Sequence, residues 1–429
     1  MLKVAWTSAS PIAATGYGRI SKEIGYRLVD MGVEVTFIGA MGADVIVWGG
    51  VHDVETPKGN KVKVLTLTDQ SSAPTVINED YAKQYEFDVV VGFMDCFGLE
   101  FLNEVKLPVI GYIPIDGPFT GSMKNYVKGF HKVIAYSKFG FRELQKFFPP
   151  SKIGLIYHGI DTETFRPLHE EEYKEARAWM ARNTGEKGKD IRVFAPPVPE
   201  DARFIGVELA ANIGPRKCLP LLMRTWAKFV KNHLDDPPHL ILQTNSYAPG
   251  KGYDLVAHRS NLGMDEFIHF PVHDPIIHAV PDEDMRKIYG ASTVFVHNAV
   301  AEGFGLPLVE ACSCGTPPIG PDNSSQSENI VGHGWLVESV DPEDYIEFPV
   351  YVPTLQEYKI PSQKSLLEKL EEAYSNPDLV KEYGRKSREF VVKNYAWKKI
   401  MPQWIELLKN VEEDLELFKK LGEGLKVNA

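Results

Sequence analysis

The sequence predicts an α/β protein with two domains, each built on a parallel β-sheet that helices cover on both faces. Near-continuous apolar runs rich in valine and isoleucine alternate with helical patterns, as expected of strands buried on both faces. The alternation stops near Pro167 and resumes near Phe204, and 429 residues exceed what one ordinary core encloses. Ligands bind at the carboxyl ends of such strands, so we expect two facing sheets with a central cleft.

Composition limits the class of protein further. Hydrophobic residues make up 44% and charged residues 24% of the chain, as in soluble globular proteins. No apolar run reaches the roughly 18–20 residues that span a bilayer, and the N-terminus lacks a secretion signal. We therefore expect a cytoplasmic protein, with peripheral membrane contact left open. The net charge of −11 argues against a nucleic-acid partner.

Residues 1–167 are predicted to form the N-terminal domain, followed by a polar linker over 168–189. Helices are expected at 19–32 and 138–148. The predicted strands of this domain are 3–8, 33–39, 43–50, 62–69, 87–93, 108–116 and 132–137.

Residues 190–404 are predicted to form the second domain. Strands are expected at 204–210, 239–244 and 292–298, and helices at 219–233 and 281–290. The end of the chain, from about Ser365, is expected to be helical, with Trp397 and Trp404 as anchors onto another surface. A C-terminal helix over about 405–429 is expected to pack back on the first domain. The segment 347–361, rich in proline and aromatic residues, has no functional interpretation.

The stretch EGFGLPLVEACSCG joins the end of a predicted strand to a predicted helix between Pro307 and Gly315. Gly303 and Gly305 allow a bend whose N–H groups, with the helix start, would form an anion-binding concavity. Glu302 and Glu310 flank this bend, and a carboxylate can accept two hydroxyl hydrogen bonds at once. The pattern therefore matches a sugar nucleotide, although a purely structural turn is the alternative.

A second candidate site follows the strand at 204–210. Adjacent Arg216 and Lys217 at a helix start would neutralise the growing charge of a departing diphosphate without a metal. No Asp-x-Asp metal motif is apparent, and the acids of DEDMRK, residues 282–287, are explained by a helix start. The four cysteines lack the spacing of a zinc site and are interpreted as reduced structural thiols: Cys96, Cys218, Cys312 and Cys314.

The first domain offers weaker candidates. Gly16 and Gly18, in the loop after the first strand, would let backbone approach a phosphate or an acceptor. Ser21 breaks the dinucleotide-binding fingerprint, which excludes a dehydrogenase of that type. Asp116 ends a predicted strand and either orients a substrate hydroxyl or stabilises a turn.

Residues 302–320 resemble the Glu-x7-Glu region of retaining glycosyltransferases of the GT-B fold, family four. In that family an acid, a Gly-Phe-Gly-Leu-Pro bend and a second acid occur in this order, as they do here. The resemblance runs from about residue 3 to 405 and is strongest from 204 to 330. Asn212 stands where many members have an arginine, and Asp116 where many have a histidine.

The resemblance implies a metal-independent, retaining hexosyltransferase with no cofactor, which uses a nucleoside diphosphate sugar and an unknown hydroxyl acceptor. The implied catalytic residues are Lys217, Arg216 and Glu302. Asp116 is a further catalytic candidate from its place at a strand end, and the role of the family's histidine does not transfer to it. The implied donor-binding residues are Gly16, Gly18, Asn212, Arg216, Lys217, Glu302, Gly303, Phe304, Gly305, Leu306 and Glu310. Alternatives are a sugar-nucleotide 2-epimerase or phosphorylase of the same fold, or a non-catalytic sugar-nucleotide-binding protein.

Overall fold

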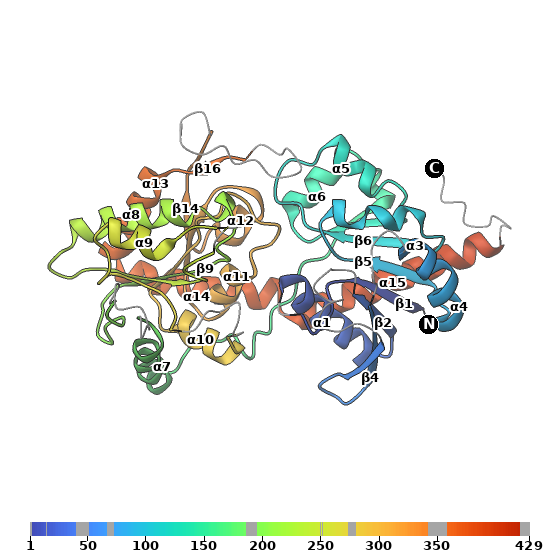
Figure 1. Cartoon of the computed structure of the whole chain (residues 1–429), viewed down its shortest axis with the longest axis horizontal. Coiled ribbons are helices and arrows are strands. Elements are labelled where there is room, and N and C mark those ends of the chain that lie inside the picture. The colour runs from blue at the N-terminus through green and yellow to red at the C-terminus, as the bar shows by residue number, and fades with distance from the viewer. Residues whose placement is uncertain are drawn as a thin grey trace. The chain divides into compact units, whose positions relative to one another are not determined.

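The chain folds into two compact units, which are described separately (Figure 1). The structure is a computed structural model. Unit 1 comprises Met1–Gly159 with Lys398–Ala429, and unit 2 comprises Ile160–Trp397. The described residues are 2–13, 15–39, 51–66, 73–185, 195–248, 250, 252–272, 280–341 and 358–420.

Unit 1 is built on an eight-stranded sheet of order β3-β4-β2-β1-β5-β6-β7-β8. Neighbouring strands are parallel, except that β3 runs antiparallel to β4 at one edge. The strands are β1 Lys3–Ser8, β2 Glu34–Gly39, β3 Val51–Glu55, β4 Lys61–Thr66, β5 Val89–Gly92, β6 Val109–Ile113, β7 Lys132–Ala135 and β8 Ile153–Leu155. The strand order reverses between β1 and β5, which is where ligands bind in sheets of this kind.

The helices of unit 1 connect successive strands of this sheet. They are α1 Gly16–Asp30, α3 Ala73–Thr75, η1 Val76–Tyr81, α4 Ala82–Tyr85, η2 Cys96–Glu104, α5 Gly121–Tyr126, α6 Lys138–Gln145 and η3 Pro150–Lys152. The last helix, α15 Trp397–Lys420, starts at the boundary of the units and continues into unit 1. Its Trp404 is fully buried, with its ring 5.4 Å from Trp6 and 4.9 Å from Tyr112.

Unit 2 contains a six-stranded parallel sheet of order β11-β10-β9-β12-β13-β14. Its strands are β9 Ile205–Leu209, β10 His239–Gln243, β11 Ile268–His269, β12 Val294–Val296, β13 Pro318–Pro321 and β14 Trp335–Val337. A small antiparallel pair, β15 Ser339–Val340 and β16 Ile360–Pro361, lies outside it. The strand order reverses between β9 and β12, and this reversal fixes where a ligand crevice opens.

Helices cover both faces of the second sheet (Figure 1). They are α7 Glu170–Asn183, η4 Pro215–Lys217, α8 Leu219–Asn232, α9 Leu255–Asn261, α10 Asp282–Gly290, α11 Leu306–Ser313, α12 Ser324–Ile330, α13 Gln363–Ser375 and α14 Pro377–Asn394. Helix α8 packs with α9 and α13, whereas α11 packs with α10 and α14. Trp226 and Phe229 of α8 are fully buried in the core of this unit.

Most predicted elements occur with boundaries within a few residues. The main difference is the predicted linker over 168–189, where Glu170–Asn183 forms the helix α7. Three glutamates in its first turn stabilise that helix, so a charged stretch that suggested a connector is an ordered element. The predicted strand 43–50 and most of the 347–361 segment lie outside the described residues.

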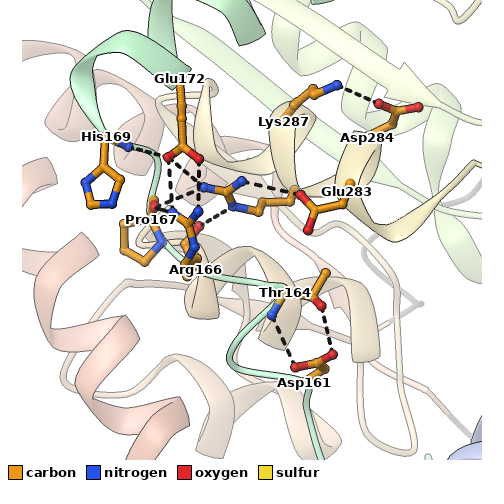
Figure 2. Close-up of polar contacts among 10 residues, drawn as sticks. Asp161, Thr164, Arg166, Pro167, His169, Glu172, Glu283, Asp284 and Lys287 are labelled. Carbon is orange, nitrogen blue, oxygen red and sulfur yellow. Dashed lines mark hydrogen bonds and ion pairs between the residues drawn. The ribbon is translucent and has the colours of Figure 1, made fainter. Parts of the chain in front are cut away.

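Hydrogen bonds to the carboxylate of Glu172 in α7 connect the start of unit 2 with α10 (Figure 2). Its carboxylate accepts hydrogen bonds from both terminal nitrogens of Arg166, at 2.9 and 3.1 Å. The backbone N–H of His169 and the Arg286 guanidinium also donate to it, each at 2.8 Å. These donors lower the pKa of Glu172, led by Arg166, so the carboxylate stays ionised and holds the chain against α10.

Candidate functional site

The strongest candidate residues lie on two loops of unit 2, at the carboxyl ends of β9 and β12. Arg216 and Lys217 form a short 3-10 turn after β9 and precede α8. Glu302 lies in the loop after β12 and precedes α11. The strand order of the sheet reverses between β9 and β12, and ligands of such sheets bind at the carboxyl ends of the strands beside this reversal. Arg216 and Lys217 are adjacent in the sequence, and Glu302 follows them by 86 and 85 positions. The structure brings these three residues together.

Glu302 is the centre of this group. One carboxylate oxygen pairs with Lys217 Nζ and lies 3.4 Å from Arg216 Nη1. The Glu302 and Lys217 side chains are only 14% and 15% exposed, and Arg216 is 34% exposed. Burial raises the pKa of Glu302, but Lys217 and Arg216 lower it more, to about 2. The site therefore holds one anion between two cations, with a net positive charge.

Hydrogen bonds to backbone carbonyls tie the two loops together. The backbone N–H of Val300 donates to the carbonyl of Arg216 at 2.9 Å. The side-chain amide of Asn298 donates to the carbonyl of Cys218 at 3.1 Å. Arg216 Nη1 donates in turn to the carbonyl of Ala301 at 2.8 Å. The cations and the anion are thus held in place by the backbone and not only by their mutual attraction.

The bend after Glu302 has part of the predicted geometry. Gly305 caps α11 with a φ of 84°, a conformation that favours glycine, and Leu306 and Pro307 form the first turn. Of the two predicted hinge glycines, Gly305 has a positive φ and Gly303 does not. Phe304 is buried against the ring of Tyr395, and its carbonyl accepts a hydrogen bond from Asn329. Phe304 therefore anchors the bend, which leaves Gly303 and Leu306 as its partly exposed members.

Helix α12 supports Glu302 through residues that the sequence reading did not identify. The hydroxyl of Ser324 accepts a hydrogen bond from the Glu302 N–H at 3.0 Å, and the hydroxyl of Ser325 donates to the Glu302 carbonyl at 2.7 Å. Ser324 has a φ of 48°, which few residues other than glycine adopt. The polar run DNSSQSEN signals a helix start, but not that this start grips the loop of Glu302.

Glu310 lies deeper than Glu302. It is 3% exposed, and Oε2 of its carboxylate accepts a hydrogen bond from the Tyr289 hydroxyl of α10 at 3.2 Å. The two acids of the motif therefore differ in surroundings: one pairs with cations and the other with a phenol.

The side chain of Asn212 lies in a buried network of hydrogen bonds. Its side-chain amide donates to the carbonyls of Asn245 and Tyr253, at 3.1 and 2.7 Å, and accepts from the N–H of Tyr253 at 2.9 Å. It is 1% exposed. A side chain at Gly252 would meet the Asn212 carbonyl oxygen at 2.1 Å. Asn212 thus joins the loops after β9 and β10 beside the cations.

The two glycines of unit 1 lie in the first turn of α1, which starts three residues earlier than predicted. Thr15 caps this helix by accepting from the Gly18 N–H at 3.0 Å. A Cβ at Gly18 would lie 2.4 Å from the Ala13 carbonyl oxygen and 2.6 Å from that of Ser10. A Cβ at Gly16 would meet no atom within 4 Å. The atoms that approach Gly18 closely therefore belong to the protein's own loop. Of the two glycines, only Gly16 has open space where a side chain would lie.

Asp116 follows β6 at the carboxyl edge of the first sheet and is partly exposed. His158, further along in the same unit, is 4% exposed, and its Nδ1 lies 2.8 Å from the Tyr112 hydroxyl. Burial lowers the pKa of His158 to about 3, so this ring is neutral at neutral pH. Of the two, only Asp116 is partly exposed at this edge of the sheet.

Possible metal ligands, membrane-spanning helices and thiols can be located in the described part of the chain. Its residues include no group of three or more His, Cys, Asp or Glu side chains arranged to hold a metal ion. Nor does any helix among them have the length and apolar character needed to cross a membrane. The four cysteines are buried and unpaired.

Comparison with known proteins supports the reading of the second unit. The family described as glycosyl transferases group 1 matches residues 273–347, which include the loop of Glu302 and all of α11. The O-antigen chain mannosyltransferase B of Escherichia coli is 46% identical over 65 residues, 15% of this chain and 16% of that protein. Several D-inositol 3-phosphate glycosyltransferases are 23–28% identical over about 200 residues, and the chain covers 41–44% of their length.

Solved structures match nearly the whole chain. A sucrose-phosphate synthase from Thermosynechococcus elongatus has a TM-score of 0.71 and 16% identity, and the match covers 96% of this chain and all of that one. The Anabaena protein HepE in complex with UDP-glucose has a TM-score of 0.68 and 15% identity, with the same coverage. At these identities the likeness shows the fold. The chain has the GT-B glycosyltransferase fold with two Rossmann-like domains, and its residues 273–347 carry the sequence of the glycosyl transferases group 1 family.

Proposed function

We propose that this protein transfers a hexose from a nucleoside diphosphate sugar to an acceptor hydroxyl, with retention of the anomeric configuration and without a metal. The observation that carries the proposal is the group of Lys217, Arg216 and Glu302 at the strand reversal of the second sheet. Its net positive charge suits a diphosphate, and its carboxylate suits a sugar hydroxyl. The family match over residues 273–347 supports the same class of reaction.

Each residue has a role in this reaction. Lys217 and Arg216 would stabilise the charge that grows on the diphosphate as the glycosidic bond breaks. Glu302, released in part from these cations by the incoming phosphates, would accept hydrogen bonds from the sugar. Glu310 would bind the ribose, and its hydrogen bond with Tyr289 would fix the carboxylate for that contact. Asp116 of unit 1 would orient the acceptor hydroxyl.

The acceptor would attack from the face that the diphosphate leaves. The departing phosphate oxygen would take the proton of the acceptor hydroxyl, so no enzymic nucleophile is required. HepE, which shares the fold, is described in complex with UDP-glucose. Uridine diphosphate and UDP-glucose are therefore the first ligands to test on this chain.

A thermal-shift screen of nucleoside diphosphates and their sugars tests the proposal directly. A ligand that binds only the folded state at about 100 times its Kd stabilises it by about 2.7 kcal/mol, which raises the Tm. We expect one base to stand out, with the same shift in chelator and in added magnesium. Loss of the shift in chelator would contradict the metal-free mechanism.

Product analysis with the selected donor separates the candidate activities. Transfer is expected only with an acceptor present, and the product should keep the donor's anomeric configuration. Conversion of the donor without acceptor would indicate an epimerase of the same fold. Binding with neither transfer nor donor hydrolysis would indicate a non-catalytic sugar-nucleotide-binding protein.

A further inference from the structure

Two ionisable side chains are buried behind Glu302, and the proposed mechanism uses neither. Glu208 lies within β9, and His297 directly follows β12. Each side chain is 1% exposed. A carboxylate or an imidazolium is costly to bury unless it is paired, so two such groups in the middle of a parallel sheet require an explanation.

The two side chains form a line that ends at Glu302. Oε1 of Glu208 lies 3.2 Å from Nδ1 of His297, and Nε2 of His297 lies 3.7 Å from Oε1 of Glu302. Neither Oε2 of Glu208 nor Nε2 of His297 has a hydrogen-bond partner within the described part of the chain. The second nitrogen of the ring therefore faces the carboxylate of the proposed active site at slightly more than hydrogen-bond distance.

Several ionisable groups surround this line. Those that act on Glu208 are His297, Lys217 and Glu302, and those that act on Glu302 are Lys217, Arg216 and His297. Burial raises the pKa of Glu208 above that of an ordinary glutamate, although His297 opposes this effect. Burial therefore acts against an ionised Glu208 that lacks a charged partner.

We propose that Glu208 and His297 together hold one proton and thereby keep an N–H of His297 directed at Glu302. If the proton is on His297, the imidazolium donates from Nδ1 to Glu208 and from Nε2 towards Glu302. If the proton is on Glu208, its O–H donates to Nδ1, and the neutral ring again carries its hydrogen on Nε2. Both arrangements have the same net charge and present the same donor to Glu302.

Loss of this proton would turn the contact between Nε2 of His297 and Glu302 from attractive to repulsive. An ionised Glu208 would attract the remaining ring hydrogen to Nδ1, and the lone pair of Nε2 would face the Glu302 carboxylate. The pair would then place an additional negative charge behind Glu302. Glu208 and His297 are thus positioning residues for Glu302, which alone of the three would touch the substrate.

The functional part of this inference rests on the proposed glycosyl transfer. An arriving diphosphate would compete with Glu302 for Lys217 and Arg216, and Glu302 would lose part of its cationic support. The N–H of His297 would remain as a donor that no anionic substrate competes for, because it lies on the buried side. This arrangement keeps Glu302 oriented at the step when its carboxylate is needed for the sugar.

Histidine NMR on the full chain tests the proton placement without any substrate. With ¹⁵N-labelled histidine, ¹³C-labelled glutamate carboxyls, and the His297→Gln and Glu208→Gln variants for assignment, we expect Nε2 of His297 to carry a hydrogen at pH 7. The ¹³C signal of Glu208 reports whether its carboxyl is protonated. Either a doubly protonated ring, or a neutral ring beside a protonated Glu208, supports the proposal. A hydrogen on Nδ1 with Nε2 bare would overturn it, and so would an ionised Glu208 beside a neutral ring.

The pH dependence of kcat/KM, measured with the donor selected above, tests the functional part. We expect wild-type kcat/KM to fall on the alkaline side, where the pair loses its proton. Glu208→Gln removes the ionisable partner while its amide can donate to Nδ1, so this alkaline fall should disappear. His333→Gln is the matched control, since His333 is also buried in unit 2 but contacts Ser387, and the fall should persist.

His297→Leu provides a second variant. Loss of the N–H that faces the Glu302 carboxylate, and that would donate to it once the cations are drawn to the diphosphate, should lower kcat/KM by roughly 10- to 100-fold at pH 7. An unchanged alkaline fall in Glu208→Gln would show that the pair is only structural. If no donor reacts at all, the proposed function fails, while the NMR result still decides where the proton lies.

Discussion

Lys217 carries the largest share of the proposed chemistry among single residues. Its ammonium is mostly buried and paired with Glu302, and its loop is fixed by the Val300–Arg216 backbone hydrogen bond. A fixed cation in a partly dry site stabilises developing charge more than a mobile one in water. The position of Lys217 is therefore set before any ligand arrives.

Lys217→Ala should lower kcat by roughly 10²–10³, the range for loss of one fixed electrostatic stabiliser. The measurement is steady-state kinetics with the donor from the thermal-shift screen. Lys228→Ala, on an exposed position of α8, is the matched control and should keep wild-type rates. Full activity of the Lys217 variant would exclude this residue from leaving-group stabilisation.

Glu310 should affect donor binding more than the chemical step. A ribose contact changes little as the glycosidic bond breaks, so Glu310→Gln should raise the donor KM by roughly tenfold while kcat changes less. Tyr289→Phe removes only the hydroxyl that Glu310 accepts from and should raise KM by a smaller factor. A large fall in kcat with an unchanged KM would place Glu310 in the transition state instead.

At the scale of elements, periodic segments were predictable and aperiodic ones were not. The strand 204–210 and the helix 219–233 follow clear apolar patterns and occur as β9 and α8. Helix α7 was missed because its charged residues obscure an apolar face. Their motifs pointed to Arg216, Lys217 and Glu302, and the structure brings these three side chains together. No motif pointed to Glu208, since it is a single acid in an apolar strand whose partner is 89 positions away.

The two glycines in the first turn of α1 should differ in how well they tolerate a side chain. Gly18→Ala should destabilise the protein by about 1–3 kcal/mol, because its Cβ would overlap the Ser10 and Ala13 carbonyl oxygens. Gly16→Ala meets no atom within 4 Å, and alanine favours a helix, so this variant should be neutral or up to about 1 kcal/mol more stable. Urea unfolding of both variants measures the difference, and equal effects would contradict the close approach at Gly18.

For the whole molecule, buried histidines should set the response to acid. Burial lowers the pKa to about 3 for His158 and His269 and to about 4 for His239 and His333. His239 and His269 lie 3.0 Å apart, ring nitrogen to ring nitrogen, and His269 Nδ1 donates to the Pro196 carbonyl. Added protons on these rings would repel each other and break the hydrogen bond between them.

Because the pKa values of these histidines are lowered in the folded protein, the free energy of unfolding falls as the pH falls. The folded pKa values lie below the unfolded value of 6.5, so the unfolded chain binds protons first as the pH falls. Each buried neutral histidine should therefore lower the free energy of unfolding by about 2 kcal/mol between pH 7 and pH 5. Unit 2 contains three of the four rings, and for this reason its unfolding should be the more acid-sensitive of the two.

Calorimetry at pH 7 and pH 5 measures this response in the wild type and in His269→Gln. The variant loses two hydrogen bonds and should melt at a lower temperature at pH 7, but its Tm should fall less on going to pH 5. His52→Gln, at a partly exposed position of β3, is the control and should keep the wild-type difference in Tm between the two pH values. Equal acid sensitivity of the His269 variant and the wild type would show that carboxylates, not buried imidazoles, determine acid unfolding.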